Sequence, residues 1–157
     1  MAEGEFALVR QHVEEALKQT TDWVGDHDLY ALLIDAAARQ RDEAALRQYA
    51  PLAEETAARH DHRLYQAIAH RAWGAAHALA GEYAEAEARL DQALALFGSL
   101  GTTWQIGRTR VELAELARAR SDAASARRHF SRALVEFEQS HAAPDAERVR
   151  AALTTLA

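Results

Sequence analysis

Apolar residues recur along the chain at steps of three and four positions, the spacing that places side chains on one face of an α-helix. Two clear series are Phe6, Val9, Val13 and Leu17, and further along Leu90, Ala93, Leu94 and Phe97. Glycine, proline or short polar clusters interrupt this pattern. It predicts an all-α protein with almost no β structure. The expected helices span residues 3–20, 28–40, 42–59, 62–80, 82–98, 103–120, 122–139 and 144–156.

A shift of forty residues brings one stretch of the chain onto another of similar character. Residues 81–97 then meet residues 121–137, and the apolar series Ala86, Leu90, Ala93, Leu94 and Phe97 meets Ala126, Phe130, Ala133, Leu134 and Phe137. In the helices before them, Trp73 and Gly74 meet Leu113 and Ala114. The match holds on the packed face and fails on the exposed one, as expected for a repeating helix pair whose neighbours restrict only the packed face.

The order of large and small residues in each pair resembles the signature of the tetratricopeptide repeat. The first copy reads His70-x2-Trp73-Gly74-x2-His77 and then Ala86-x3-Leu90-x2-Ala93, and the second reads Arg110-x2-Leu113-Ala114-x2-Ala117 and then Ala126-x3-Phe130-x2-Ala133. Small residues such as Gly74 and Ala86 are expected where paired helices approach most closely, because a larger side chain would force them apart.

A third, more divergent copy is predicted at residues 28–60. Its register is expected to slip by one residue, and Pro51 is expected to bend its second helix or to weaken a hydrogen bond there. The expected core residues of this copy are Leu29, Leu32, Leu33 and Ala36 on the first helix, and Ala45, Tyr49, Leu52 and Ala53 on the second.

The resemblance implies a right-handed α-solenoid of antiparallel helix pairs with about eight helices. We expect a single tetratricopeptide-like domain over residues 1–157, made of an N-terminal helix (1–27), the degenerate repeat (28–60), two repeats (61–100 and 101–140) and a C-terminal capping helix (141–157). The period near 40 rather than 34, without the usual closing proline, is similar to the tandem repeats of large bacterial ATP-binding transcriptional activators and kinesin light chains. This sequence shows no ATPase or helix-turn-helix motif beside the repeats.

Charge and composition narrow the possible functions. A formal net charge of −6 argues against a general nucleic-acid binder, and the absence of cysteine excludes disulfides and thiol chemistry. The first twenty residues mix charges throughout, and no stretch approaches the ~18 uncharged residues that a membrane span needs. We therefore expect a cytoplasmic protein that binds neither nucleic acid nor a membrane.

Eight histidines raise the question of a metal site, because all-helical phosphohydrolases use a His-Asp pair with further His and Asp ligands. The candidates are His27-Asp28 and His60-Asp61-His62. The repeat favours a solvated linker for the second group, since His60 and Asp61 fall where Leu100 and Gly101 fall one repeat later. His70 and His77 occupy core-type positions, where partly buried and hydrogen-bonded histidines are expected.

Enzymatic chemistry finds no support in the remaining motifs. The sequence has no GxSxG motif, no glycine-rich phosphate loop and no predicted strand to present one. We expect no enzyme activity, no catalytic residues, no metal and no cofactor.

In proteins that this chain resembles, the first helix of each pair lines a concave groove that receives a peptide or helix of a partner. Carried over position by position, the resemblance implicates Asp35, Arg39, Ile68, Arg71, Ala75, Leu79, Arg108, Val111, Glu112, Glu115 and Arg118. Members that clamp a terminal carboxylate do so with asparagine and lysine, and this chain has no asparagine, so that activity is disfavoured.

The function expected from these observations is a non-catalytic protein–protein interaction module, present as a monomer or homodimer. The alternative is a ligand- or peptide-sensing regulatory domain related to the repeat domain of a transcriptional activator.

Overall fold

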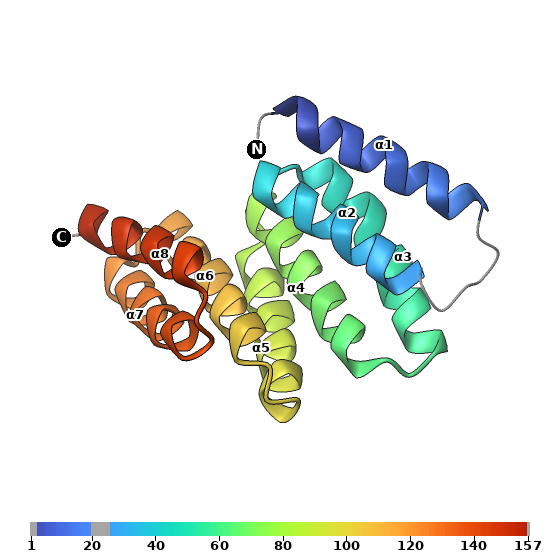
Figure 1. Ribbon diagram of the computed structural model, residues 1–157. Coiled ribbons are helices and arrows are strands. Elements are labelled where there is room, and N and C mark those ends of the chain that lie inside the picture. The colour runs from blue at the N-terminus through green and yellow to red at the C-terminus, as the bar shows by residue number, and fades with distance from the viewer. Residues whose placement is uncertain (1–2, 20–25, 157) are drawn as a thin grey trace.

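The computed structural model describes residues 3–19 and 26–156, and every element in these ranges is an α-helix (Figure 1). In chain order the helices are α1 (Glu3–Gln19), α2 (Asp26–Gln40), α3 (Glu43–Arg59), α4 (Arg63–Leu79), α5 (Tyr83–Ser99), α6 (Thr103–Ala119), α7 (Ala123–Gln139) and α8 (Ala143–Thr155). The predicted all-α fold is confirmed, and each helix begins and ends within two residues of its predicted bounds.

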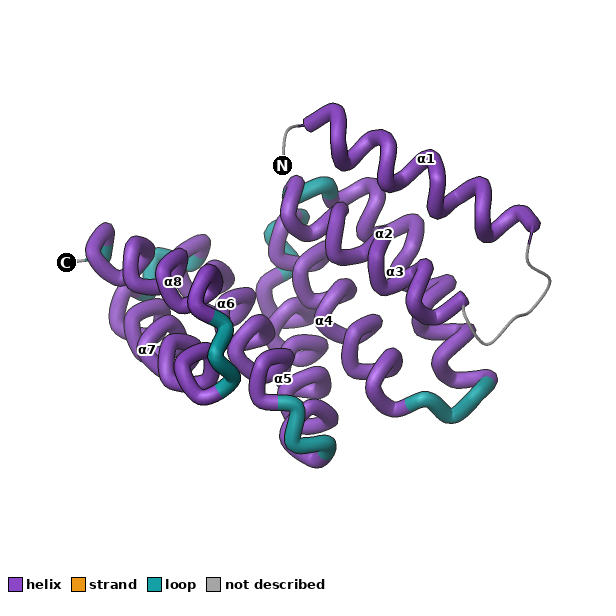
Figure 2. Tube along the Cα trace, in the orientation of Figure 1, coloured by secondary structure: helices purple, strands orange, loops and turns teal. Residues whose placement is uncertain are grey.

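Short turns join the helices from α2 onward, and consecutive helices pack side by side (Figure 2). Helix α4 also contacts both α2 and α6, so the first helices of successive pairs form one layer of the solenoid. The second helices, α3, α5 and α7, pack behind this layer. The layer containing α2, α4 and α6 is called the inner layer below, and α8 follows them in the same position of the repeat.

Helix length and turn geometry recur every twenty residues, half the forty-residue period of the helix pair. Helices α3 to α7 each contain 17 residues. The turns place a residue with positive φ every twenty positions, at Arg41, Asp61, Gly81, Gly101, Ser121 and His141. After each of these residues a backbone N–H bonds a carbonyl five residues earlier, as Glu82 does with His77 at 2.9 Å. This is the Schellman hydrogen bond that ends helices with a left-handed residue.

The divergent repeat keeps the same register, so the predicted one-residue slip is wrong. Leu32 and Leu52, expected in the core, are 52% and 40% exposed. The buried positions instead continue the forty-residue series with large and small side chains exchanged. Ile34 and Leu46 stand where the later pair has Gly74 and Ala86, and Ala50 and Ala57 stand where it has Leu90 and Phe97. The summed side-chain volume of these four positions is about the same in the two helix pairs, so both pairs can keep a similar distance between their helices. Helix α3 continues across Pro51.

Close helix approach explains the small residues of the better-preserved repeats. A Cβ atom added to Gly74 would lie 2.5 Å from Cγ of Leu90, and one added to Gly107 would lie 2.8 Å from Cε1 of Phe137. Both contacts are shorter than side chains tolerate without moving. The expected close approach at Gly74 is therefore confirmed, and Gly107 marks a second one that the sequence pattern did not reveal.

Polar side chains tie successive helices together behind the inner layer. Glu54 on α3 accepts hydrogen bonds from Nε1 of Trp73 on α4 at 2.8 Å and from Arg89 on α5 at 2.6 Å. Arg89 also lies 2.9 Å from Nδ1 of His70, and burial, followed by the Arg89 charge, lowers the pKa of that histidine. The ring of His77 stacks on Trp73 at 5.5 Å. His70 and His77 are thus partly buried and hydrogen-bonded, as predicted.

Candidate partner-binding groove

A groove of about 240 Å³ lies where α2, α6, α7 and α8 approach one another. Its apolar floor includes Phe130, Phe137 and Val149, which are almost fully buried. Arg39 on α2 and Arg148 on α8 stand exposed at its rim. The remaining lining residues are Ala38, Arg108, Val111, Glu112, Glu115, Asp145 and Ala152. The groove therefore combines an apolar floor with charges of both signs.

A smaller depression continues along the same face, between the C-terminal ends of α2, α4 and α6. It is lined by Ala38, Arg41, Ala75, Ala78, Leu79, Glu112, Glu115, Leu116 and Ala119. Glu112 and Glu115 line both hollows. Together with Ala38 on α2, these two residues of α6 connect the hollows.

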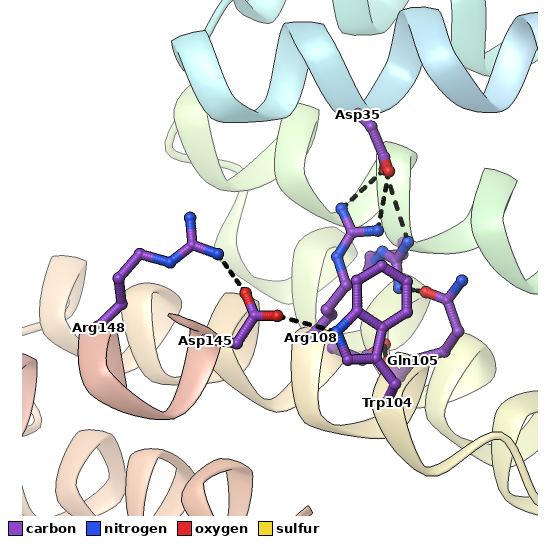
Figure 3. A network of polar contacts seen from close by, with 8 residues as sticks. Asp35, Trp104, Gln105, Arg108, Asp145 and Arg148 are labelled. Carbon is purple, nitrogen blue, oxygen red and sulfur yellow. Dashed lines mark hydrogen bonds and ion pairs between the residues drawn. The ribbon is translucent and has the colours of Figure 1, made fainter. Parts of the chain in front are cut away.

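An ion pair joins two helices of the inner layer that are not neighbours in sequence (Figure 3). Arg108 on α6 donates two hydrogen bonds to the carboxylate of Asp35 on α2, at 2.9 and 2.7 Å. Arg71 on α4 lies beneath them, with Nη2 3.8 Å from the same carboxylate and Nη1 donating to Gln105 at 2.6 Å. One carboxylate thus pairs with guanidinium groups from two other helices, and the bidentate hydrogen bonds fix the position of Arg108.

The network extends from α6 to α8. The guanidinium of Arg108 lies over the ring of Trp104, 4.8 Å from its centre, and Nε1 of Trp104 donates to Asp145 at 2.9 Å. Asp145 in turn pairs with Arg148. Polar contacts therefore cross the inner face from α2 to α8, as Figure 3 shows, and they hold the walls of the groove in place before any partner arrives.

Burial changes the ionisation of two groups beside this network. Arg71 is only 5% exposed, and burial, with a further contribution from Arg108, lowers its pKa to about 9. Burial also raises the pKa of Glu112, and the nearby charges of Arg71 and Arg108 oppose this rise without cancelling it. For both groups, burial therefore disfavours the charged form.

The residues expected from the sequence to bind a partner fall into three sets. Arg39, Arg108, Val111, Glu112 and Glu115 line the groove, and Ala75 and Leu79 line the smaller depression. Asp35 and Arg118 are occupied in ion pairs, with Arg108 and with Glu115. Ile68 and Arg71 on α4 are 6% and 5% exposed, so they offer a partner almost no contact surface.

Sequence reasoning missed the contribution of α8. Asp145, Arg148, Val149 and Ala152 all line the groove. The forty-residue shift contained the necessary signal, because it carries Arg108 onto Arg148 and Glu112 onto Ala152. Applying the repeat to the last helix, rather than treating that helix as a cap, would have identified this wall.

The histidine motifs meet in space at one end of α2. The ring of His27 lies 5.2 Å from that of His60 and 5.3 Å from that of His62. His60, Asp61 and His62 are exposed, in keeping with the predicted linker, whereas His27, expected in a break between helices, lies on α2 and is 3% exposed. Within residues 3–19 and 26–156, no group of three or more His, Asp or Glu side chains has the arrangement of a metal site.

Comparisons of the sequence with protein-family models and with curated proteins find no match. Function is therefore inferred from the groove itself. As to a bilayer, each described helix is either too short or too polar to span one.

Proposed function

We propose that this chain is a non-catalytic, tetratricopeptide-like interaction module that binds a peptide or helix of a partner protein in the groove between α2 and α8. The observation that carries the proposal is a groove with an apolar floor and a charged rim, built from both ends of the inner layer. Buried apolar contacts provide affinity, and charged groups around them select the partner.

Prior organisation of the groove supports this role. The ion pair of Asp35 with Arg108 already links α2 to α6, and Asp145 already connects α8 to Trp104 on α6. These hydrogen-bonded side chains are ordered before a partner binds, so less of their entropy is lost on binding.

The size of the groove favours side chains of a peptide over a small-molecule ligand. Small-molecule sites usually enclose about 300–1,000 Å³ and bury most of the ligand. The groove here measures about 240 Å³ and continues into the smaller depression lined by Leu79 and Glu115. An elongated segment, with one or two side chains inserted, fits such a surface better than a compact ligand does.

Affinity capture with a groove-filling variant tests the proposal. Ala152 lines the groove and is partly exposed, so Ala152→Trp fills the binding space. Ala95 is exposed on α5, away from the groove, and Ala95→Trp provides a control with the same added side chain. We expect Ala152→Trp to lose partners that the wild type and Ala95→Trp both retain from a lysate of the source cells.

Equal recovery by all three proteins would contradict the proposal. Circular dichroism of each variant verifies that the helices remain folded. Alanine at Arg71 is unsuitable for this purpose, because Arg71 is buried and ion-paired and its removal would disturb the fold.

A further inference from the structure

Glu112 differs from the other carboxylates around the groove. Asp35 binds Arg71 and Arg108, Asp145 binds Arg148, and Glu115 binds Arg118. Within the described ranges, Glu112 alone among these acids makes no hydrogen bond or ion pair, although it lines both hollows of the inner face. Glu112 is therefore the carboxylate of this described set that remains unpaired beside both hollows.

Glu112 is partly exposed, and no side chain among the described residues makes a hydrogen bond or ion pair with its carboxylate. Burial is the largest influence on its ionisation and raises its pKa despite three arginines nearby. A partly buried carboxylate is less favourable than one in water unless a hydrogen-bonded counter-charge compensates it. Of the three arginines, Arg71 and Arg108 direct their hydrogen bonds to Asp35 and Gln105, which leaves this compensation incomplete.

The cations at the rim are in a different situation. Arg39 and Arg148 at the rim, and Arg41 beside the smaller depression, are exposed, so water hydrates them and salt screens their charge. An acidic partner would gain little from them, because surface ion pairs contribute about 0–1 kcal/mol. The formal net charge of −6 also attracts cationic rather than anionic partners over longer distances.

We propose that the partner segment places a lysine or arginine side chain in the groove, with its cationic group on Glu112 and its aliphatic stem over the floor formed by Phe137 and Val149. Long basic side chains commonly bury their methylene groups on an apolar surface while the head remains with a polar partner. The proposal rests on the binding role of the groove and adds the chemical class of the residue that the groove selects.

Peptides that differ at one position provide the test. The probes are acetylated, amidated pentapeptides of sequence Ala-Leu-X-Leu-Ala, in which X is lysine, norleucine or glutamate. Norleucine keeps the aliphatic stem and removes the charge. Each peptide is titrated into the ¹⁵N-labelled full chain, and amide shifts of Val111, Glu112 and Ala152 report occupation of the groove. We expect the lysine peptide to bind about tenfold more tightly than the norleucine peptide, with the glutamate peptide weaker still.

Two protein variants locate the effect. Glu112→Gln keeps the shape of the side chain and removes its charge, and we expect it to reduce lysine-peptide affinity to the norleucine level. Glu87→Gln removes a carboxylate that is half-exposed on α5 and paired with Arg120 at 2.9 Å. We expect Glu87→Gln to bind the lysine peptide as the wild type does, which separates the local effect of Glu112 from the change in net charge.

Each other outcome has a defined meaning. Norleucine or glutamate peptides that bind the groove as tightly as lysine would refute the selection of a basic residue while leaving groove binding intact. Lysine-peptide binding that survives Glu112→Gln, shifts that lie outside the groove, or no shifts at millimolar peptide would also refute it. Whether the groove binds a partner at all is tested separately, by affinity capture with the Ala152→Trp variant.

Discussion

At the scale of single residues, the glycines of this chain have two different roles. Gly81 has φ of +79° and nothing within 4 Å of an added Cβ, and its position in the turn is occupied elsewhere by Asp61 and Ser121. Gly74 has ordinary helical geometry and is needed because Leu90 packs directly against it. The first glycine eases a backbone conformation, and the second makes room for a neighbouring helix.

Substitution distinguishes these roles. Gly81→Ala should lower the free energy of unfolding by about 1 kcal/mol and leave partner binding intact, because only backbone strain is introduced. Gly74→Val should lower it by about 3 kcal/mol, because the new side chain overlaps Leu90 and must separate α4 from α5. Urea denaturation measures both values, and a larger loss for Gly81→Ala would contradict the assignment.

The stability of the fold should depend on pH through the ionisation of Glu112. Its raised pKa means that the folded chain holds this proton more tightly than the unfolded chain, so its contribution to stability falls as pH rises from about 4.5 through the raised value. We expect Glu112→Gln to melt at a higher temperature than the wild type at pH 7, with the difference shrinking towards pH 4.5. Thermal unfolding at both pH values measures this, and a less stable variant at pH 7 would show that Glu112 is already compensated.

At the scale of helices, the unit of seventeen helical residues and one turn explains what the sequence could predict. Apolar spacing and breaks such as Gly81 are local signals, and they located the helices closely. The register of the divergent repeat is hard to read from the sequence, because Ile34 and Leu46 are large where the later pair has small residues. The two pairs match only when side-chain volumes are summed across facing helices.

Contacts between helices that are far apart along the chain leave no comparable pattern in the sequence. Asp35 and Arg108 are 73 positions apart, and their contact depends on how α2, α4 and α6 pack in the inner layer. Sequence reasoning placed both on the concave face but assigned them to a partner, whereas the structure pairs them with each other. The shape and charge of the groove could therefore be predicted only in part.

A double-mutant cycle measures how strongly this contact joins α2 to α6. Combining Asp35→Asn with Arg108→Gln should give a coupling energy of about 1–3 kcal/mol in unfolding, because the pair is bidentate and Arg108 is largely shielded from water. The exposed pair Glu87 and Arg120 serves as control and should give less than about 1 kcal/mol. Equal coupling in the two cycles would show that the bridge does not fix the groove.

At the scale of the whole molecule, the core is divided along the solenoid. One buried cluster joins α1 to α5, another joins α6 to α8, and a smaller one at Leu90 and Leu113 connects them. Repeat proteins of this kind gain stability mainly from contacts between neighbouring units. A destabilising substitution at one end of the solenoid should therefore loosen mainly the helices at that end.

Hydrogen exchange tests this division. Val149 is 2% exposed in the cluster of α6 to α8, and Val149→Asp places a charge there. We expect amides of α7 and α8 to lose protection while those of α3 and α4 keep it. Uniform loss of protection would mean that the chain unfolds as a single unit.

Site-specific photo-crosslinking tests most directly whether the groove between α2 and α8 is where a partner binds. A benzophenone amino acid replaces Ala38 on the α2 wall, Ala152 on the α8 wall or exposed Ala95 on α5, in separate proteins irradiated in a lysate of the source cells. We predict that Ala38 and Ala152 capture the same partner and that Ala95 does not. Capture of that partner from Ala95, or from neither wall of the groove, would contradict the account.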